Sequence, residues 1–117
     1  MENLINAQVR MRNRCPFRAA SLKGELVGVL AGLIPTGQLP AEHADRLHEL
    51  QAERADRYMG LGGVRDGVKD APVYVVSSYG TPIAWVTQGG DVVIPEVTYS
   101  PTTTRHQKIA RRALADA

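Results

Sequence analysis

The chain has 117 residues, enough for one domain with its own core, and its 44% apolar and 22% charged residues are typical of a soluble globular protein. Its single cysteine, Cys15, excludes an internal disulfide and a multi-cysteine metal site and indicates a reducing compartment, so we expect a cytoplasmic protein. The most apolar run, residues 26–34, is too short to span a membrane, and no membrane partner is expected.

The net charge is only +2, but basic residues gather at the two ends of the chain. Residues 1–24 hold five basic residues and one acid, and residues 105–112 hold four basic residues and no acid. The segment between them holds ten acids and five basic residues. If the two ends lie together in the fold, they form one positive face.

The first third of the chain leaves two alternatives open. Residues 1–15 predict either a basic arm or a short helix, because basic and apolar residues alternate and Pro16 prevents a long helix. Residues 22–34 are mostly apolar, and we interpret them as a strand. A buried helix is the alternative, since periodicity does not separate short apolar runs.

Residues 40–57 form the clearest predicted helix. Pro40 stands at its start, strong helix formers follow, and Glu42 and Arg46 place opposite charges four residues apart. Glycines end this helix, and we predict a flexible glycine-rich loop over residues 60–72.

Three strands are predicted after this loop. Residues 73–79 and 81–87 are rich in β-branched and aromatic side chains, residues 88–91 are a hairpin turn signal, and residues 92–94 form the answering strand. A final helix follows. The order predicts a single α+β domain over residues 1–117, with a three-stranded meander plus one earlier strand in a small antiparallel sheet and two or three helices packed on one face.

The final helix is predicted to begin near Thr104. A threonine at the N-cap and a glutamine three residues later, here Thr104 and Gln107, form a capping box. His106 is expected at the edge of the buried side, where its simplest role is a hydrogen bond to a backbone carbonyl or a tyrosine.

The same stretch has the components of an anion-binding corner. Hydroxyl groups, free backbone N–H groups and an arginine at a helix start are an arrangement that binds phosphate. The residues expected to bind an anion or nucleic acid are Thr102, Thr103, Thr104, Arg105, His106, Lys108, Arg111 and Arg112, together with Arg10, Arg12 and Arg14 near the N-terminus.

Three segments carry a resemblance to a known family. Ser78-Tyr-Gly-Thr-Pro-Ile-Ala-Trp85 and Tyr99-Ser-Pro-Thr-Thr-Thr-Arg-His-Gln107, preceded by Pro16-Phe-Arg-Ala-Ala-Ser-Leu22, resemble motifs of short uncharacterised proteins from actinobacteria and their bacteriophages. The resemblance covers about residues 16–22 and 73–112, and residues 31–70 are not clearly part of it. It implies a phage or actinobacterial accessory protein and assigns no activity. Its motif residues in this chain are Tyr79, Thr81, Tyr99, Ser100 and Gln107.

An enzyme needs a nucleophile or an acid–base pair, and the one dense candidate cluster is formed by Tyr79, Ser100, Thr103, Arg105 and His106. No zinc-protease helix and no phosphate-binding loop accompanies it. We therefore assign no catalytic residue and expect neither a metal nor a cofactor.

Two functions remain as expectations. The first is a small non-enzymatic protein-interaction module that binds a host or phage protein through a sheet edge or the helix over residues 40–57. The alternative is a nucleic-acid-binding protein that uses the basic C-terminal helix and the basic N-terminal arm.

Overall fold

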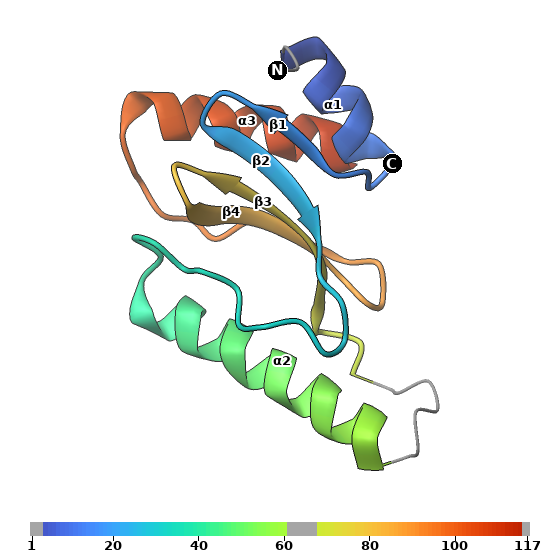
Figure 1. Ribbon diagram of the computed structural model, residues 1–117. Helices are drawn as coiled ribbons and strands as arrows, with labels where there is room; N and C mark the ends of the chain where they lie inside the picture. Colours follow the sequence, from blue (N-terminus) through green and yellow to red (C-terminus); the bar gives the residue numbers. More distant parts are fainter. Residues whose placement is uncertain (1–3, 61–67, 116–117) are drawn as a thin grey trace.

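The computed structural model describes residues 4–60 and 68–115, and these residues form three helices and one five-stranded antiparallel sheet (Figure 1). This confirms the predicted α+β class. The strands lie in chain order across the sheet, and the elements are α1 (Leu4–Arg12), β1 (Phe17–Ala19), β2 (Leu22–Leu26), α2 (Ala41–Gly60), β3 (Pro72–Ser78), β4 (Thr81–Thr87), β5 (Val92–Val93) and α3 (Pro101–Ala115).

The two open alternatives are resolved in the N-terminal third. The segment predicted as an arm or a short helix is the helix α1. In residues 22–34 the strand interpretation holds for β2 only, and residues 27–40 form an irregular connection to α2. Of the loop predicted over residues 60–72, Gly60 ends α2, Pro72 begins β3, and residues 61–67 lie outside the described residues.

Helices cover both faces of the sheet, and the prediction of helices on one face was wrong. Figure 1 shows α1 and α3 on one side of the sheet and α2 on the other. The physical reason lies in β3 and β4, whose side chains are mostly buried on both faces. Such a pair of strands needs an apolar layer on each side.

The α1–α3 side holds the larger core. Tyr74 and Val76 of β3 face this side, and the small residues Ala110 and Ala113 allow α3 to approach closely. The other buried members are Ala7, Met11, Phe17, Ala19, Leu22, Ile83, Ala84, Val86 and Leu114. On the opposite face, Val75 and Trp85 pack with residues of the connection and of α2, namely Ile34, Leu39, Ala44 and Leu47.

A bulge in β4 adjusts this packing. The pairing between β3 and β4 shifts between Val76 and Ser77, so that Val76 lies opposite Ala84 while Ser77 lies opposite Pro82. Ile83 is the extra residue, and it joins Ala84 in the same core. Without the extra residue, strict alternation would direct these two side chains to opposite faces.

The turn between β3 and β4 has an unusual backbone. Tyr79 and Gly80 have φ angles of 51° and 78°, the pair of positive values that a type I′ hairpin turn requires. The Tyr79 amide donates a hydrogen bond of 2.9 Å to the carbonyl of Ser21 in the β1–β2 turn. The turn is therefore tied to its neighbouring hairpin.

The connection before α2 reaches this turn as well. Its course along α2 is fixed at Ile34, whose amide donates to Gln51 Oε1 at 2.9 Å and whose carbonyl lies 2.8 Å from His48 Nε2. The Gln38 amide donates to Thr81 Oγ1 at 2.8 Å, and Gly37 has a φ of 51°. A Cβ on Gly37 would lie only 2.7 Å from the Gly80 carbonyl oxygen, so only glycine fits there.

Among the helices that the structure describes, none combines the length and the hydropathy of a membrane-spanning segment.

Gly24 provides a test of the packing between the first strands. A Cβ on this β2 residue would overlap the Tyr74 hydroxyl and the ring of Phe17, whereas a Cβ on Gly28 meets nothing within 4 Å. We expect Gly24→Ala to lower the free energy of unfolding by about 1–3 kcal/mol, the usual cost of overpacking, and Gly28→Ala to leave it nearly unchanged. Urea denaturation of both variants measures this difference, and equal stability of the two would contradict the described packing.

Candidate functional site

The last helix begins one turn earlier than the sequence predicted. Ser100 is its N-cap, because the Ser100 hydroxyl accepts a hydrogen bond of 3.2 Å from the Thr103 amide and the Ser100 carbonyl accepts one of 2.9 Å from the Thr104 amide. Pro101 occupies the first helical position, where its missing N–H costs nothing. The predicted capping box of Thr104 and Gln107 was therefore wrong, and the Ser-Pro pair is the stronger start signal.

Gln107 has a different role. Its side chain is buried and donates a hydrogen bond of 3.3 Å to the carbonyl of Val97, in the segment that leads from β5 to α3. This hydrogen bond therefore holds the segment before α3 against the buried side of the helix.

Ser78 and His106 form the central contact of the site. The Ser78 hydroxyl, at the end of β3, lies 2.7 Å from His106 Nδ1 on the second turn of α3. It also lies 3.3 Å from Thr103 Oγ1, which in turn accepts a hydrogen bond of 3.2 Å from the Ser100 hydroxyl. This chain of hydroxyls joins the hairpin to the start of the helix, and it connects residues of two motif segments, Ser78 and Thr103, that are 25 positions apart in sequence.

The ring of Tyr79 adds an aromatic contact. It is stacked with the imidazole of His106, with ring centroids 6.5 Å apart and an angle of 28° between the planes. His106 is therefore buried between the end of β3 and the Tyr79 side chain, as a structural histidine that bonds a serine hydroxyl. The prediction that His106 forms a hydrogen bond with a backbone carbonyl or a tyrosine was wrong.

The environment of His106 favours the neutral form of its imidazole. Burial lowers its pKa below the ordinary value of 6.5, and the positive charge of the neighbouring Arg105 lowers this pKa further. A neutral imidazole keeps one ring nitrogen as an acceptor and one as a donor, which suits a shared hydrogen bond with a hydroxyl.

The Ser78–His106 distance of 2.7 Å is one at which a nucleophile and its base can lie, and the contact is buried within the fold. Ser78 is only 1% exposed, and its hydroxyl contacts both His106 and Thr103. Within the described residues, no carboxylate forms a hydrogen bond with His106 to orient it, as a triad requires. The pair therefore connects two elements of the fold.

A cavity of about 370 Å³ lies between the hairpin turn and the start of α3. Its lining is polar and uncharged, and besides Ser78, Ser100 and Thr103 it includes Gln38, Tyr79, Thr81 and Tyr99. The Tyr99 hydroxyl is buried and finds no hydrogen-bond partner among the described residues. Burial also raises the pKa of this phenol, which therefore stays protonated and retains a hydrogen to donate.

A second, open hollow of about 440 Å³ lies on the outer side of the same helix start. Tyr99 borders both spaces, and Arg105 and Lys108 supply positive charge to the second. Neither cation forms an ion pair with a described residue. The remaining members of its lining are Thr98, Pro101 and Thr104.

The structure divides the predicted binding residues into two groups. Thr103 and His106 are buried in the contact with the hairpin. The exposed side of α3 carries Thr102, Arg105, Lys108, Arg111 and Arg112, with Thr104 half-buried beside them. Of the N-terminal residues, Arg10 and Arg12 are exposed on α1, and Arg14 donates a hydrogen bond to the Met11 carbonyl.

Two site residues were missed by sequence reasoning. Ser78 was quoted in a motif but not assigned to the site, although its place before the turn residues Tyr79 and Gly80 marks it as a strand end. Gln38 carries no sequence signal, because the irregular connection brings it to the hairpin only in the folded chain.

Over residues 4–60 and 68–115, no three His, Cys, Asp or Glu side chains gather in a group that would hold a metal ion.

The fold and the site define a small α+β protein with an uncharged polar cavity at the start of a basic last helix. The chain belongs to a family of unknown function, DUF8033, whose model matches residues 42–113. This match spans α2 to α3, so residues 42–70, which the motif resemblance did not clearly include, are part of the family, and residues 16–22 lie outside the match. Comparison with curated proteins and with solved structures finds no match.

The buried histidine predicts a pH dependence of stability. Because the pKa of His106 is lower in the folded chain than its ordinary value of 6.5, the unfolded chain binds a proton more readily, and stability falls as the pH drops below about 6.5. Above this value both states are neutral and the contribution is constant. We expect urea denaturation from pH about 7.5 to about 5.5 to show this loss in the wild type and a smaller one in His106→Asn.

His43 on α2 supplies the matched control, since it is more exposed than His106. His43→Asn should keep the pH dependence of the wild type. If stability depends on pH equally in His106→Asn and in the wild type, the pKa of this histidine does not change on folding.

Proposed function

We propose that this protein is a non-enzymatic binding module whose α1–α3 layer binds nucleic acid. The observation that carries the proposal is the separation of charge between the two faces of the sheet. The sequences of α1 and α3 contain no acidic residue, whereas α2 on the opposite face contains five acidic and three basic residues. We call the basic residues of the first layer the basic face, and they are Arg10, Arg12, Arg105, Lys108, Arg111 and Arg112.

The two helices that carry the basic face pack against each other. α1 packs against α3 through the shared core on one side of the sheet, as Figure 1 shows. The two basic ends of the sequence thus lie together. On α3 the buried residues include His106, Ala110 and Leu114, while every basic residue of that helix is exposed to solvent.

The arrangement suits a polyanion. Lys108, Arg111 and Arg112 form no ion pair with a described residue, so their charges are available to phosphate groups. Phosphate contacts by such residues dominate the affinity of nucleic-acid-binding proteins and release counterions, which makes binding sensitive to salt. The surface geometry therefore favours nucleic acid over the first expectation, a protein partner.

The test is a salt titration of oligonucleotide binding. We expect Arg105→Ala/Lys108→Ala to weaken binding at low salt and to reduce the slope of log affinity against log salt by between about 1 and 2, because each lost phosphate contact removes about 0.7–0.9 from that slope. Fluorescence anisotropy with a labelled oligonucleotide measures both quantities.

Arg46→Ala/Arg57→Ala on α2 removes the same number of charges from the opposite face. This variant should bind as the wild type does. Absence of binding by the wild type at low salt, or equal losses in the two variants, would refute the proposal.

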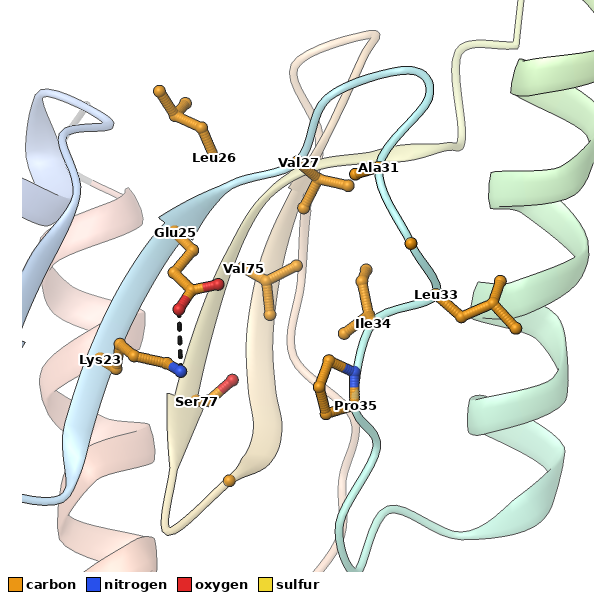
Figure 2. A pocket seen from close by; sticks show the side chains of 12 residues that line it. Lys23, Glu25, Leu26, Val27, Ala31, Leu33, Ile34, Pro35, Val75 and Ser77 are labelled. Carbon is orange, nitrogen blue, oxygen red and sulfur yellow. Dashed lines mark ion pairs between the residues drawn. The ribbon is translucent and has the colours of Figure 1, made fainter.

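A protein partner is the second candidate because three leucines near the end of β2 are exposed. Leu26, Leu30 and Leu33 are 61%, 62% and 61% exposed, and all three lie on or beside the connection that follows β2. Leu26 and Leu33 border a groove of about 130 Å³ between this connection and the β2–β3 strands. Figure 2 shows this groove and its lining residues.

The groove is smaller than the range of about 300–1,000 Å³ that is usual for small-molecule sites, so it suits a single apolar side chain of a host or phage protein.

A pair of matched variants examines this candidate. Leu33→Asp places a charge beside the groove, and Met59→Asp places one at an equally exposed apolar position on α2. A bacterial protein that binds the groove should be retained by the immobilised wild type and by Met59→Asp, and its recovery should fall several-fold with Leu33→Asp. Quantitative mass spectrometry of the retained proteins measures this, and an unchanged set in all three samples would remove the groove as a binding site.

A further inference from the structure

The cavity between the hairpin turn and α3 has the chemistry of a base-binding pocket. Its polar groups are hydroxyls and one amide, and none of them is charged. A phosphate prefers charged donors, whereas the edge of a nucleobase presents donors and acceptors that neutral groups match. The volume of about 370 Å³ lies within the usual range of small-ligand sites.

Tyr99 lines this cavity and has a hydroxyl without a hydrogen-bond partner among the described residues. The hydroxyl is buried as well. A buried polar group without a partner costs free energy, so a ligand atom that accepts this hydrogen bond would remove the cost.

Tyr79 supplies an aromatic surface beside the same cavity. All six aromatic residues of the chain lie in its described part, and Tyr79, at 65% exposed, is the exposed one among them. Its backbone is fixed by the bond to Ser21, and its ring is supported by the imidazole of His106. Nucleobases stack on such rings with little regard to sequence.

The basic face is continuous with this pocket. Tyr99 borders the cavity on one side and the hollow of Arg105 and Lys108 on the other. A nucleotide placed here has its phosphate near the two cations and its base near Tyr79 and Tyr99. A base that is paired and stacked in a duplex is not free to enter.

We propose that this cavity binds one unpaired nucleobase and that the nucleic acid recognised by the protein is therefore single-stranded. The inference rests on the proposed function, because the basic face supplies the phosphate contacts. The base contributes through stacking on Tyr79 and through a hydrogen bond with the Tyr99 hydroxyl.

The experiment separates the base from the phosphates. The probes are oligothymidylate of about ten nucleotides and an abasic strand of equal length, which carries the same phosphates without bases. We expect the wild type to bind oligothymidylate at least about fivefold more tightly than the abasic strand, the lower end of what stacking of one base contributes. Oligouridylate, run in parallel, shows whether RNA supplies the base equally well.

Variants test whether the preference for oligothymidylate over the abasic strand comes from the pocket. Tyr79→Ala should abolish it, and Tyr79→Phe, which keeps the ring, should retain it. Arg105→Ala/Lys108→Ala should weaken both strands by the same factor. Tyr99→Phe removes a hydroxyl that bonds no described residue, so it should lower the preference without lowering the thermal midpoint.

The outcomes distinguish the two proposals. Equal binding of both strands by the wild type, or a preference that survives in both Tyr79→Ala and Tyr99→Phe, overturns the base pocket and leaves the basic face in place. Binding of neither strand at low salt overturns both. If Tyr79→Ala unfolds, as circular dichroism would show, Tyr99→Phe alone decides.

Discussion

Burial of the β3–β4 hairpin on both faces is the constraint on which the rest of the structure depends. Every residue of β4 is buried, with the α1–α3 layer on one side and Trp85 against the α2 layer on the other. A hairpin packed from both sides cannot shift without disturbing two cores. Its turn is therefore a fixed reference point, and α3 is attached to it through the contact of Ser78 with His106. The position of the cavity follows from that attachment.

The same two-sided arrangement places basic and acidic residues on opposite faces of the sheet. The sheet lies between a helix layer without acidic residues and a helix in which acids outnumber basic residues. A net charge of +2 conceals this separation, because the positive charge of the first layer is offset partly by α2 and partly by acids elsewhere in the chain. The side of the sheet to which each helix packs thus determines the electrostatics more than composition does.

Local patterns predicted most of the elements, although not the strand β1, and nonlocal contacts determined what could not be predicted. The helix over residues 40–57 and the strands after it follow from periodicity and turn residues, and they agree with α2, β3, β4 and β5. The helix start was misplaced because Thr104 and Gln107 also satisfy a capping pattern, although Ser100 is the cap. The contact between Ser78 and His106 spans 28 residues, and no local rule encodes it. The face to which α2 packs depends on Val75 and Trp85 for the same reason.

Tyr79 has a left-handed backbone, which is unfavourable for a residue with a Cβ atom. At a φ of 51° a side chain with a Cβ costs roughly 1–2 kcal/mol, and glycine or asparagine would occupy the position with less strain. A large aromatic residue is therefore not the most stabilising residue at this position. Contact with His106 offsets part of the cost, but the ring remains 65% exposed and so contributes little to the core. The identity of this turn residue is thus not explained by the stability of the fold alone.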